Sequence, residues 1–167
     1  ILFMTLLKPG GRVGIVLPDG SLFGEGVKSR IKEKLLEECN MHTIVRLPPG
    51  VFQPYAGVNT NLVFFTKGQP TKEVWYYQMP LPAGLKQYTK NRGITDAEFE
   101  PIAKWFKNKK ANDNAWKVPI ADIKARNFNL DFKNPKSADA VEELSSKDLV
   151  KRILEKEEEI KEILNNI

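Results

Sequence analysis

Residues 1–20, "ILFMTLLKPGGRVGIVLPDG", place the end of a helix directly before a buried strand. The apolar run at 1–7 stops at residues 8–11, where lysine, proline and two glycines favour a helix C-terminus. Residues 12–18 are β-branched and apolar at consecutive positions, which predicts a central strand covered on both faces. About two helical turns precede this strand, too few to be stable alone. We therefore expect the chain to be a piece of a longer protein.

The stretch that follows the first strand predicts an amphipathic helix at about residues 25–39. Its apolar positions recur every four residues and are expected to face a sheet: Val27, Ile31, Leu35 and Cys39. The lysines at 28 and 32 are expected to point elsewhere. Residues 43–47 then predict a second strand, parallel to the first across a right-handed crossover.

A hairpin follows the second strand. Only the loop 48–57 separates it from a third β-like stretch, "VNTNLVFFTKG", which ends at Gly68. This loop is too short for a helical crossover, so the pair is expected to be antiparallel. The predicted fold class is α/β, with a mixed sheet whose last hairpin is antiparallel.

The remainder of the chain predicts further strands and helices. Residues 73–79 form a β-like run, and Thr95 with Glu98 forms a capping box for a helix through about Lys107. The inner face of that helix is expected to carry Phe99, Ile102, Ala103 and Phe106. Residues 116–135 predict one short helix and an extended piece, and a last helix begins near residue 145. These patterns suggest three segments: a catalytic-type domain at 1–79, a basic extension at 80–136 and a helical segment at 137–167.

Charge and composition narrow the functional classes. The net charge is +5, and residues 101–136 carry nine Lys/Arg against three Asp, so this segment could face a polyanion, although many basic domains bind none. A lone Cys39 and a lone His42 exclude a disulfide scaffold and make a protein-built zinc site unexpected. The unpaired cysteine favours a reducing, cytoplasmic location. No apolar stretch approaches the roughly 20 residues that span a bilayer, so no membrane partner is expected.

Motifs for catalysis are missing from this sequence. Gly20, Gly24 and Gly26 follow a strand and precede a helix, as a phosphate-binding loop does, but their spacing matches neither common glycine motif, and turn glycines are the alternative. No serine lies in a nucleophile elbow, and the single histidine has no catalytic neighbours in sequence. We therefore predict no catalytic residue and no metal ligand among these residues.

The proline-rich stretch "PPGVFQPYAGVNTN", residues 48–61, is the strongest candidate for a binding site. It holds Phe52 and Tyr55 in a stiffened loop, next to Asn59 and Asn61 at the start of a strand. Aromatic rings beside amides can stack on and hydrogen-bond a planar base. A loop that is merely packed is the alternative.

Two stretches in order, "LLKPGGRVGIVLPDGSLFG" and "IVRLPPGVFQPYAGVNTNLVFFTKG", resemble the back half of the catalytic domain of DNA adenine-N6 methyltransferases. The closest likeness is to the modification subunit of type I restriction-modification systems, and "NLDFKNP" extends it loosely. This resemblance implies a Rossmann-like sheet, S-adenosylmethionine as methyl donor and double-stranded DNA as substrate, with the adenine flipped out of the duplex. It also implies a specificity subunit and a restriction subunit as partners.

The same resemblance assigns roles by position. Phe52 matches the aromatic that stacks on the flipped adenine, with Tyr55 as the second choice, and a cleft border is expected at Asp19, Gly20, Ser21 and Leu22. The family's amine-binding motif and its glycine-rich cofactor loop are both absent from this sequence. The fragment alone is therefore expected to be inactive and to lack the main cofactor-binding motif.

The terminal helix carries an apolar seam with heptad spacing, formed by Leu149, Ile153, Ile160, Ile163 and Ile167. The seam is expected either to pack on its own domain or to dock onto the specificity subunit. Two other functions remain open at this stage. One is a non-catalytic module that binds DNA and a partner, and the other is a methyltransferase that acts on RNA or protein.

Overall fold

The computed structural model describes residues 2–24, 26–137 and the single positions 150, 154, 156, 157 and 161. Residues 1–136 form one compact unit and residues 137–167 a second. The fold and the site below belong to the first unit.

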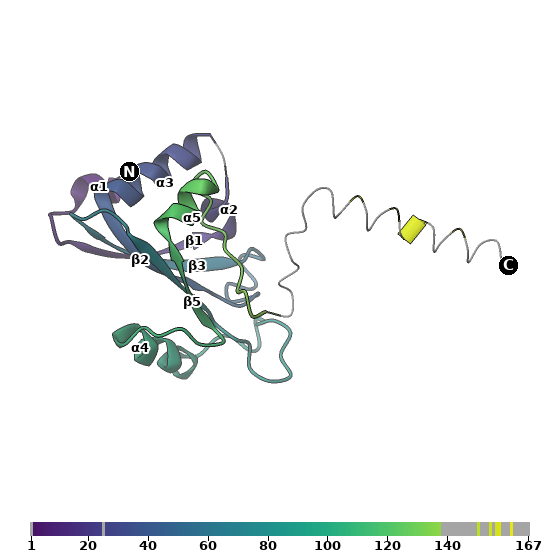
Figure 1. The fold of residues 1–167 in the computed structure, drawn as a ribbon. Coiled ribbons are helices and arrows are strands. Elements are labelled where there is room, and N and C mark those ends of the chain that lie inside the picture. Colours follow the sequence, from purple (N-terminus) through teal and green to yellow (C-terminus); the bar gives the residue numbers. More distant parts are fainter. Residues whose placement is uncertain are drawn as a thin grey trace. The chain divides into compact units, whose positions relative to one another are not determined.

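The first unit is built on a five-stranded mixed sheet with the order β1-β3-β2-β4-β5 (Figure 1). The strands are β1 (Arg12–Pro18), β2 (Cys39–Arg46), β3 (Thr60–Lys67), β4 (Glu73–Gln78) and β5 (Ala115–Pro119). β3 is antiparallel to both of its neighbours, β4 is parallel to β2, and β5 is antiparallel to β4. The predicted antiparallel hairpin is confirmed. The first two strands do run in the same direction, but β3 lies between them.

Helices cover both faces of this sheet. They are α1 (Leu2–Leu6), α2 (Asp19–Leu22), α3 (Val27–Glu38), the 3-10 turn η1 (Asp96–Phe99), α4 (Glu100–Lys107) and α5 (Ile120–Ala125). α1, α3 and α5 lie on one face and α4 on the other (Figure 1). Met4 of α1, Leu36 of α3 and Ile123 of α5 belong to one apolar core. Ile102 and Trp105 of α4 belong to the other. The sheet therefore separates two apolar layers.

β1 is not the central strand that its apolar sequence predicts. It lies at the edge of the sheet and, among the described residues, pairs only with β3. Its side chains alternate between partly buried and exposed, and Val16 is 47% exposed. A continuous apolar sequence fits a strand covered on both faces, but within this unit one face of β1 is left uncovered.

The buried face of α3 also differs from the prediction. Val27 is exposed, while Ser29, Lys32 and Leu36 are buried, and Cys39 belongs to the start of β2. Lys32 faces inward because its ammonium group donates to the carbonyl oxygens of Leu22 and Gly24, at 2.8 and 3.1 Å. Hydrophobic periodicity thus placed Ile31 and Leu35 correctly on the side of the sheet, but it did not indicate a polar anchor such as Lys32.

The segment after β4 was predicted in part. The capping box of Thr95 and Glu98 is confirmed, but Trp105 takes the buried position expected for Ala103, which is exposed. The short helix expected in 116–135 is α5. Strand β5 was not predicted, because five residues that end in proline carry little strand signal before their pairing with β4 is known.

Among the described residues, no helix is long and apolar enough to cross a membrane.

Candidate functional site

The carboxyl ends of β1 and β2 meet at one edge of the sheet. Pro18 pairs with Thr60, and Arg46 pairs with Asn61, so both strands end beside the start of β3. α2 leaves β1 at this edge and the loop 48–57 leaves β2 there. The backbone N–H of Asp19 donates to the carbonyl of Asn59 at 3.0 Å. Loops at the carboxyl ends of strands are where α/β sheets place their binding residues.

A partly buried polar cluster occupies this edge. Asp19 Oδ1 accepts a hydrogen bond from Asn61 Nδ2 at 2.6 Å and lies 3.9 Å from the guanidinium of Arg46. Arg46 also pairs with Asp131 at 2.7 Å. Asn61 is fully buried, and within the described residues its Oδ1 has no hydrogen-bond partner. One cation between two carboxylates gives the cluster a formal net charge of −1.

The loop 48–57 is held by backbone contacts. Its turn is closed by hydrogen bonds from Tyr55 N and Ala56 N to the carbonyl of Phe52, at 2.9 and 3.0 Å. The N–H of Tyr88 donates to the carbonyl of Pro49 at 3.0 Å. The Tyr88 hydroxyl in turn donates to Glu98 at 2.7 Å, and burial and this carboxylate raise the pKa of Tyr88 to about 12. The loop is therefore tied to the start of the α4 segment.

The two aromatic side chains predicted for base stacking differ in exposure. Phe52 is 38% exposed and Tyr55 is 94% exposed, and both belong to the same turn. A ring that is partly packed and partly exposed suits a fixed stacking platform better than a fully exposed one. The structure therefore leaves Phe52 as the first choice of the two.

The predicted cleft border at residues 19–22 forms the short helix α2. Asp19 joins the polar cluster, and Ser21 lines a cavity behind it, but Leu22 is buried in the core and Gly20 is only partly exposed. Sequence reasoning did not single out Arg46 or Asp131. The stretch "NLDFKNP" contains Asp131 and contributed to the family likeness, but nothing in its local pattern indicated an ion pair with β2.

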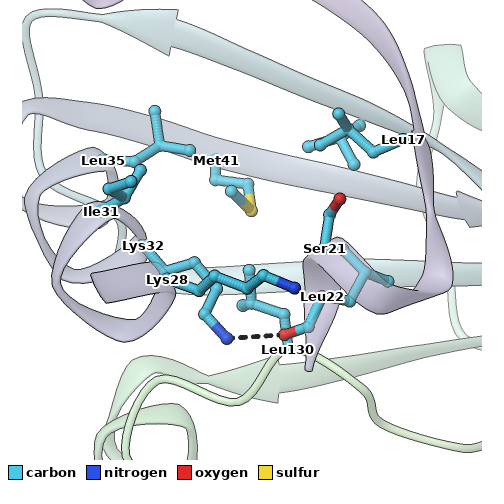
Figure 2. A pocket seen from close by; sticks show the side chains of 10 residues that line it. Leu17, Ser21, Leu22, Lys28, Ile31, Lys32, Leu35, Met41 and Leu130 are labelled. Atoms are coloured by element: carbon cyan, nitrogen blue, oxygen red, sulfur yellow. Dashed lines mark hydrogen bonds between the residues drawn. The ribbon is translucent and has the colours of Figure 1, made fainter. Parts of the chain in front are cut away.

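A cavity of about 240 Å³ lies between α3, α2 and the sheet (Figure 2). Its walls are mainly apolar: Leu17, Leu22, Ile31, Leu35, Met41, Val63 and Leu130. Figure 2 shows the side chains of Lys28 and Lys32 running along one side of it. Burial, and to a lesser extent the charge of Lys28, lowers the pKa of Lys32. This cavity therefore presents apolar surface and ammonium groups.

These residues do not fit S-adenosylmethionine. The donor is a sulfonium cation, which ammonium groups repel, and no carboxylate lines the cavity to accept bonds from ribose hydroxyls. The glycines at 24 and 26 have positive φ; a Cβ at 24 would meet the flexible Lys28 side chain at 2.7 Å, whereas one at 26 would have nothing within 4 Å. A methyl-donor site built by the described residues is not supported.

His42 is partly buried within β2, and several lysines of the basic segment are ion-paired. Lys109 lies 3.2 Å from His42 Nδ1, and burial together with this charge lowers the pKa of His42 to about 4.

Three lysines of the basic segment are ion-paired: Lys104 with Glu100, Lys117 with Glu73 and Lys136 with Asp113. In the part of the chain that the structure describes, no three histidine, cysteine or acidic side chains gather as metal ligands. The seam residues Leu149, Ile153, Ile160, Ile163 and Ile167 lie outside the described residues.

Comparison with known proteins identifies the class. A family model described as N-6 DNA Methylase matches residues 1–144. The chain therefore belongs to the N-6 DNA methylase family.

Its relatives are modification subunits of type I systems. It is 54% identical over 147 residues to the Escherichia coli type I restriction enzyme EcoEI methylase subunit, covering 84% of this chain and 30% of that protein. A crystal structure of a modification subunit of a putative type I restriction enzyme from Vibrio vulnificus YJ016 superposes with a TM-score of 0.77 at 42% identity, covering 84% of this chain and 33% of that one. A structure from a study of type I R-M complex assembly and conformational transition covers 99% of this chain and 38% of that one, with a TM-score of 0.77 at 38% identity. The chain thus spans about a third of the length of these proteins.

Proposed function

We propose that the chain is the C-terminal part of the catalytic region of a type I modification subunit, which methylates the exocyclic N6 amine of a target adenine in double-stranded DNA. Its fold would be the back half of a Rossmann-like sheet. The family, the type I relatives and the antiparallel β3 support this proposal. S-adenosylmethionine is the methyl donor and binds upstream of these residues. The sequence-specific complex includes the specificity subunit and the restriction subunit.

The role proposed for this part is one wall of the pocket for the flipped adenine. The observation that carries it is Phe52, which is 38% exposed on a loop fixed to Tyr88 at the carboxyl edge of the sheet. A base that leaves the duplex loses its stacking energy. Stacking on an aromatic ring restores about 1 to 3 kcal/mol of that energy. A fixed loop avoids the entropy cost of ordering the ring when the base arrives.

The seam on residues 149–167 is proposed to bind the specificity subunit. This part of the proposal rests on the sequence pattern, in which apolar residues recur on a strongly charged helix. The proposed need for a partner subunit and the absence of the family's glycine-rich cofactor loop from this sequence lead to one expectation. The 167-residue chain alone has no methyltransferase activity.

The test replaces Phe52 by alanine in the complete subunit assembled with its partners. We expect methylation of a duplex that carries the target site to fall about 5- to 150-fold, which corresponds to the loss of one stacking contact of about 1 to 3 kcal/mol. Phe3→Ala is the matched control, because Phe3 is a phenylalanine of similar exposure (48%) on α1, outside the loop 48–57. If Phe52→Ala methylates and binds DNA like the wild type, the stacking role is wrong. The alternative of a non-catalytic DNA- and partner-binding module then gains support.

A further inference from the structure

Residues 127–132, called the strap here, cross the same edge of the sheet as the aromatic loop. Asn127 and Phe128 have positive φ, at 51° and 59°, and turn the chain away from α5. The N–H of Leu130 donates to the carbonyl of Leu22 in α2 at 3.0 Å, and the carbonyl of Leu130 accepts the Tyr76 hydroxyl of β4 at 3.0 Å. The strap is therefore fixed to elements on both sides of β2.

Arg46 joins this strap to β2. One nitrogen of its guanidinium, Nη1, lies 2.7 Å from Asp131 Oδ1 and donates to the carbonyl of Phe132 at 2.9 Å. The other, Nη2, lies 3.9 Å from Asp19 Oδ1. The side chains of Arg46, Asp19 and Asp131 are 19, 26 and 28% exposed. The guanidinium therefore makes one hydrogen bond, to the Phe132 carbonyl, and two ion pairs of unequal length, the shorter with Asp131.

The position of Arg46 matters for the aromatic loop. Arg46 is the last residue of β2, its carbonyl accepts the N–H of Met79 at 3.0 Å, and the loop begins two residues later at Pro48. Pro48 and Pro49 stiffen the chain between them, because proline fixes φ. The start of the loop therefore has fewer backbone conformations with which to adjust to a change at the end of β2.

From these contacts we infer that Arg46 and Asp131 are a positioning pair, which holds the loop 48–57 so that Phe52 meets the flipped base in a productive orientation. The inference rests on the proposed function. Neither residue touches the base. Without the charge on Asp131, the Arg46 side chain loses its shorter ion pair, and the nearest remaining carboxylate is Asp19 on the α2 side. Reorientation of the guanidinium then alters the packing at the end of β2, where the loop begins.

Asp131→Asn, in the complete subunit assembled with its partners, removes the charge and keeps the side-chain size. We expect kcat for DNA methylation to fall about tenfold, with KM for DNA within about twofold, because small misplacements of a reacting group cost rate rather than binding. Asp131→Glu restores the charge and is expected to recover part of kcat. Asp113→Asn is the matched control, since Asp113 pairs with Lys136 at 2.9 Å and both side chains are well exposed.

A second readout follows the stacking itself. With 2-aminopurine in place of the target adenine, the Asp131→Asn complex is expected to fluoresce more strongly than the wild-type and Asp113→Asn complexes, since the flipped base is less well stacked. Equal kcat and equal fluorescence in Asp131→Asn and Asp113→Asn would overturn the positioning role. A lower melting temperature with unchanged fluorescence would overturn it too, because the pair would then be purely structural. If the wild-type assembly transfers no methyl group to adenine, the proposed function itself fails.

Discussion

Gly50 packs directly against the backbone of Tyr88: a Cβ at position 50 would lie 2.2 Å from the Tyr88 carbonyl oxygen. Gly50 also has a φ of +83°, which side-chain-bearing residues rarely adopt. The carbonyl of its neighbour Pro49 accepts the N–H of the same tyrosine. This contact fixes the aromatic loop against the segment that leads to α4.

Gly50→Ala should therefore destabilise the unit strongly. We expect the free energy of unfolding to fall by at least about 3 kcal/mol, from backbone strain plus a clash that only backbone movement can relieve. Gly84→Ala is the control, because Gly84 has a similar φ of +79° but nothing within 4 Å of its Cβ position. That variant should lose only about 1 to 2 kcal/mol. Equal losses in urea unfolding would mean that the approach to Tyr88 is unimportant.

Lys32 should matter for stability although it is a lysine on a helix. It is 5% exposed and its ammonium holds the carbonyls of Leu22 and Gly24. Lys32→Met leaves these acceptors without their charged donor, and we expect a loss of about 1 to 3 kcal/mol. Lys28→Met, which removes an exposed bond to the carbonyl of Gly20, should change stability by less than about 0.5 kcal/mol. Chemical denaturation of both variants compares the two anchors, and equal effects would contradict this prediction.

His42 predicts a pH dependence. Its folded pKa of about 4 lies below the ordinary value of 6.5, so the unfolded chain takes up the proton first. Its contribution is therefore complete above pH 6.5 and declines as the pH falls toward 4. Between pH 6.5 and 5.5 we expect a loss of about 1 kcal/mol. Stability curves of the wild type and His42→Gln over this interval should diverge by that amount. Parallel curves would show that the histidine titrates normally.

The open edge of β1 predicts self-association of the 167-residue chain. Within the described residues β1 pairs only with β3, and Val16 is 47% exposed on it. An unpaired apolar strand edge is a template for another chain, and a charge on it blocks pairing. We expect Val16→Lys to lower the mass measured by light scattering, whereas Val58→Lys, at an exposed loop position, does not. A wild-type chain that stays monomeric at high concentration would argue against an adhesive edge.

Much of the local structure could be predicted from the residues themselves. The lysine, proline and glycines at 8–11 end α1, residues 12–18 form β1 and the capping box at Thr95 precedes α4. The predicted loop 48–57 is too short for a helical crossover and so indicates a hairpin, which is present. These features depend on short-range propensities, chain length and turn chemistry, which the sequence states directly. The two motifs in order were also enough to indicate the family.

The sequence by itself thus determined four of the five strands, the hairpin and the family, while the tertiary structure decided which side chains meet. The pairing of Arg46 with Asp131 and the approach of Gly50 to Tyr88 join segments far apart in the chain, and the burial of Lys32 joins α3 to the residues at the end of α2. No local pattern encodes them, because each depends on how the strands order in the sheet and where the strap crosses it. The apolar sequence of β1 is typical of a strand covered on both faces, and the order of the strands shows that β1 lies at the edge of the described sheet.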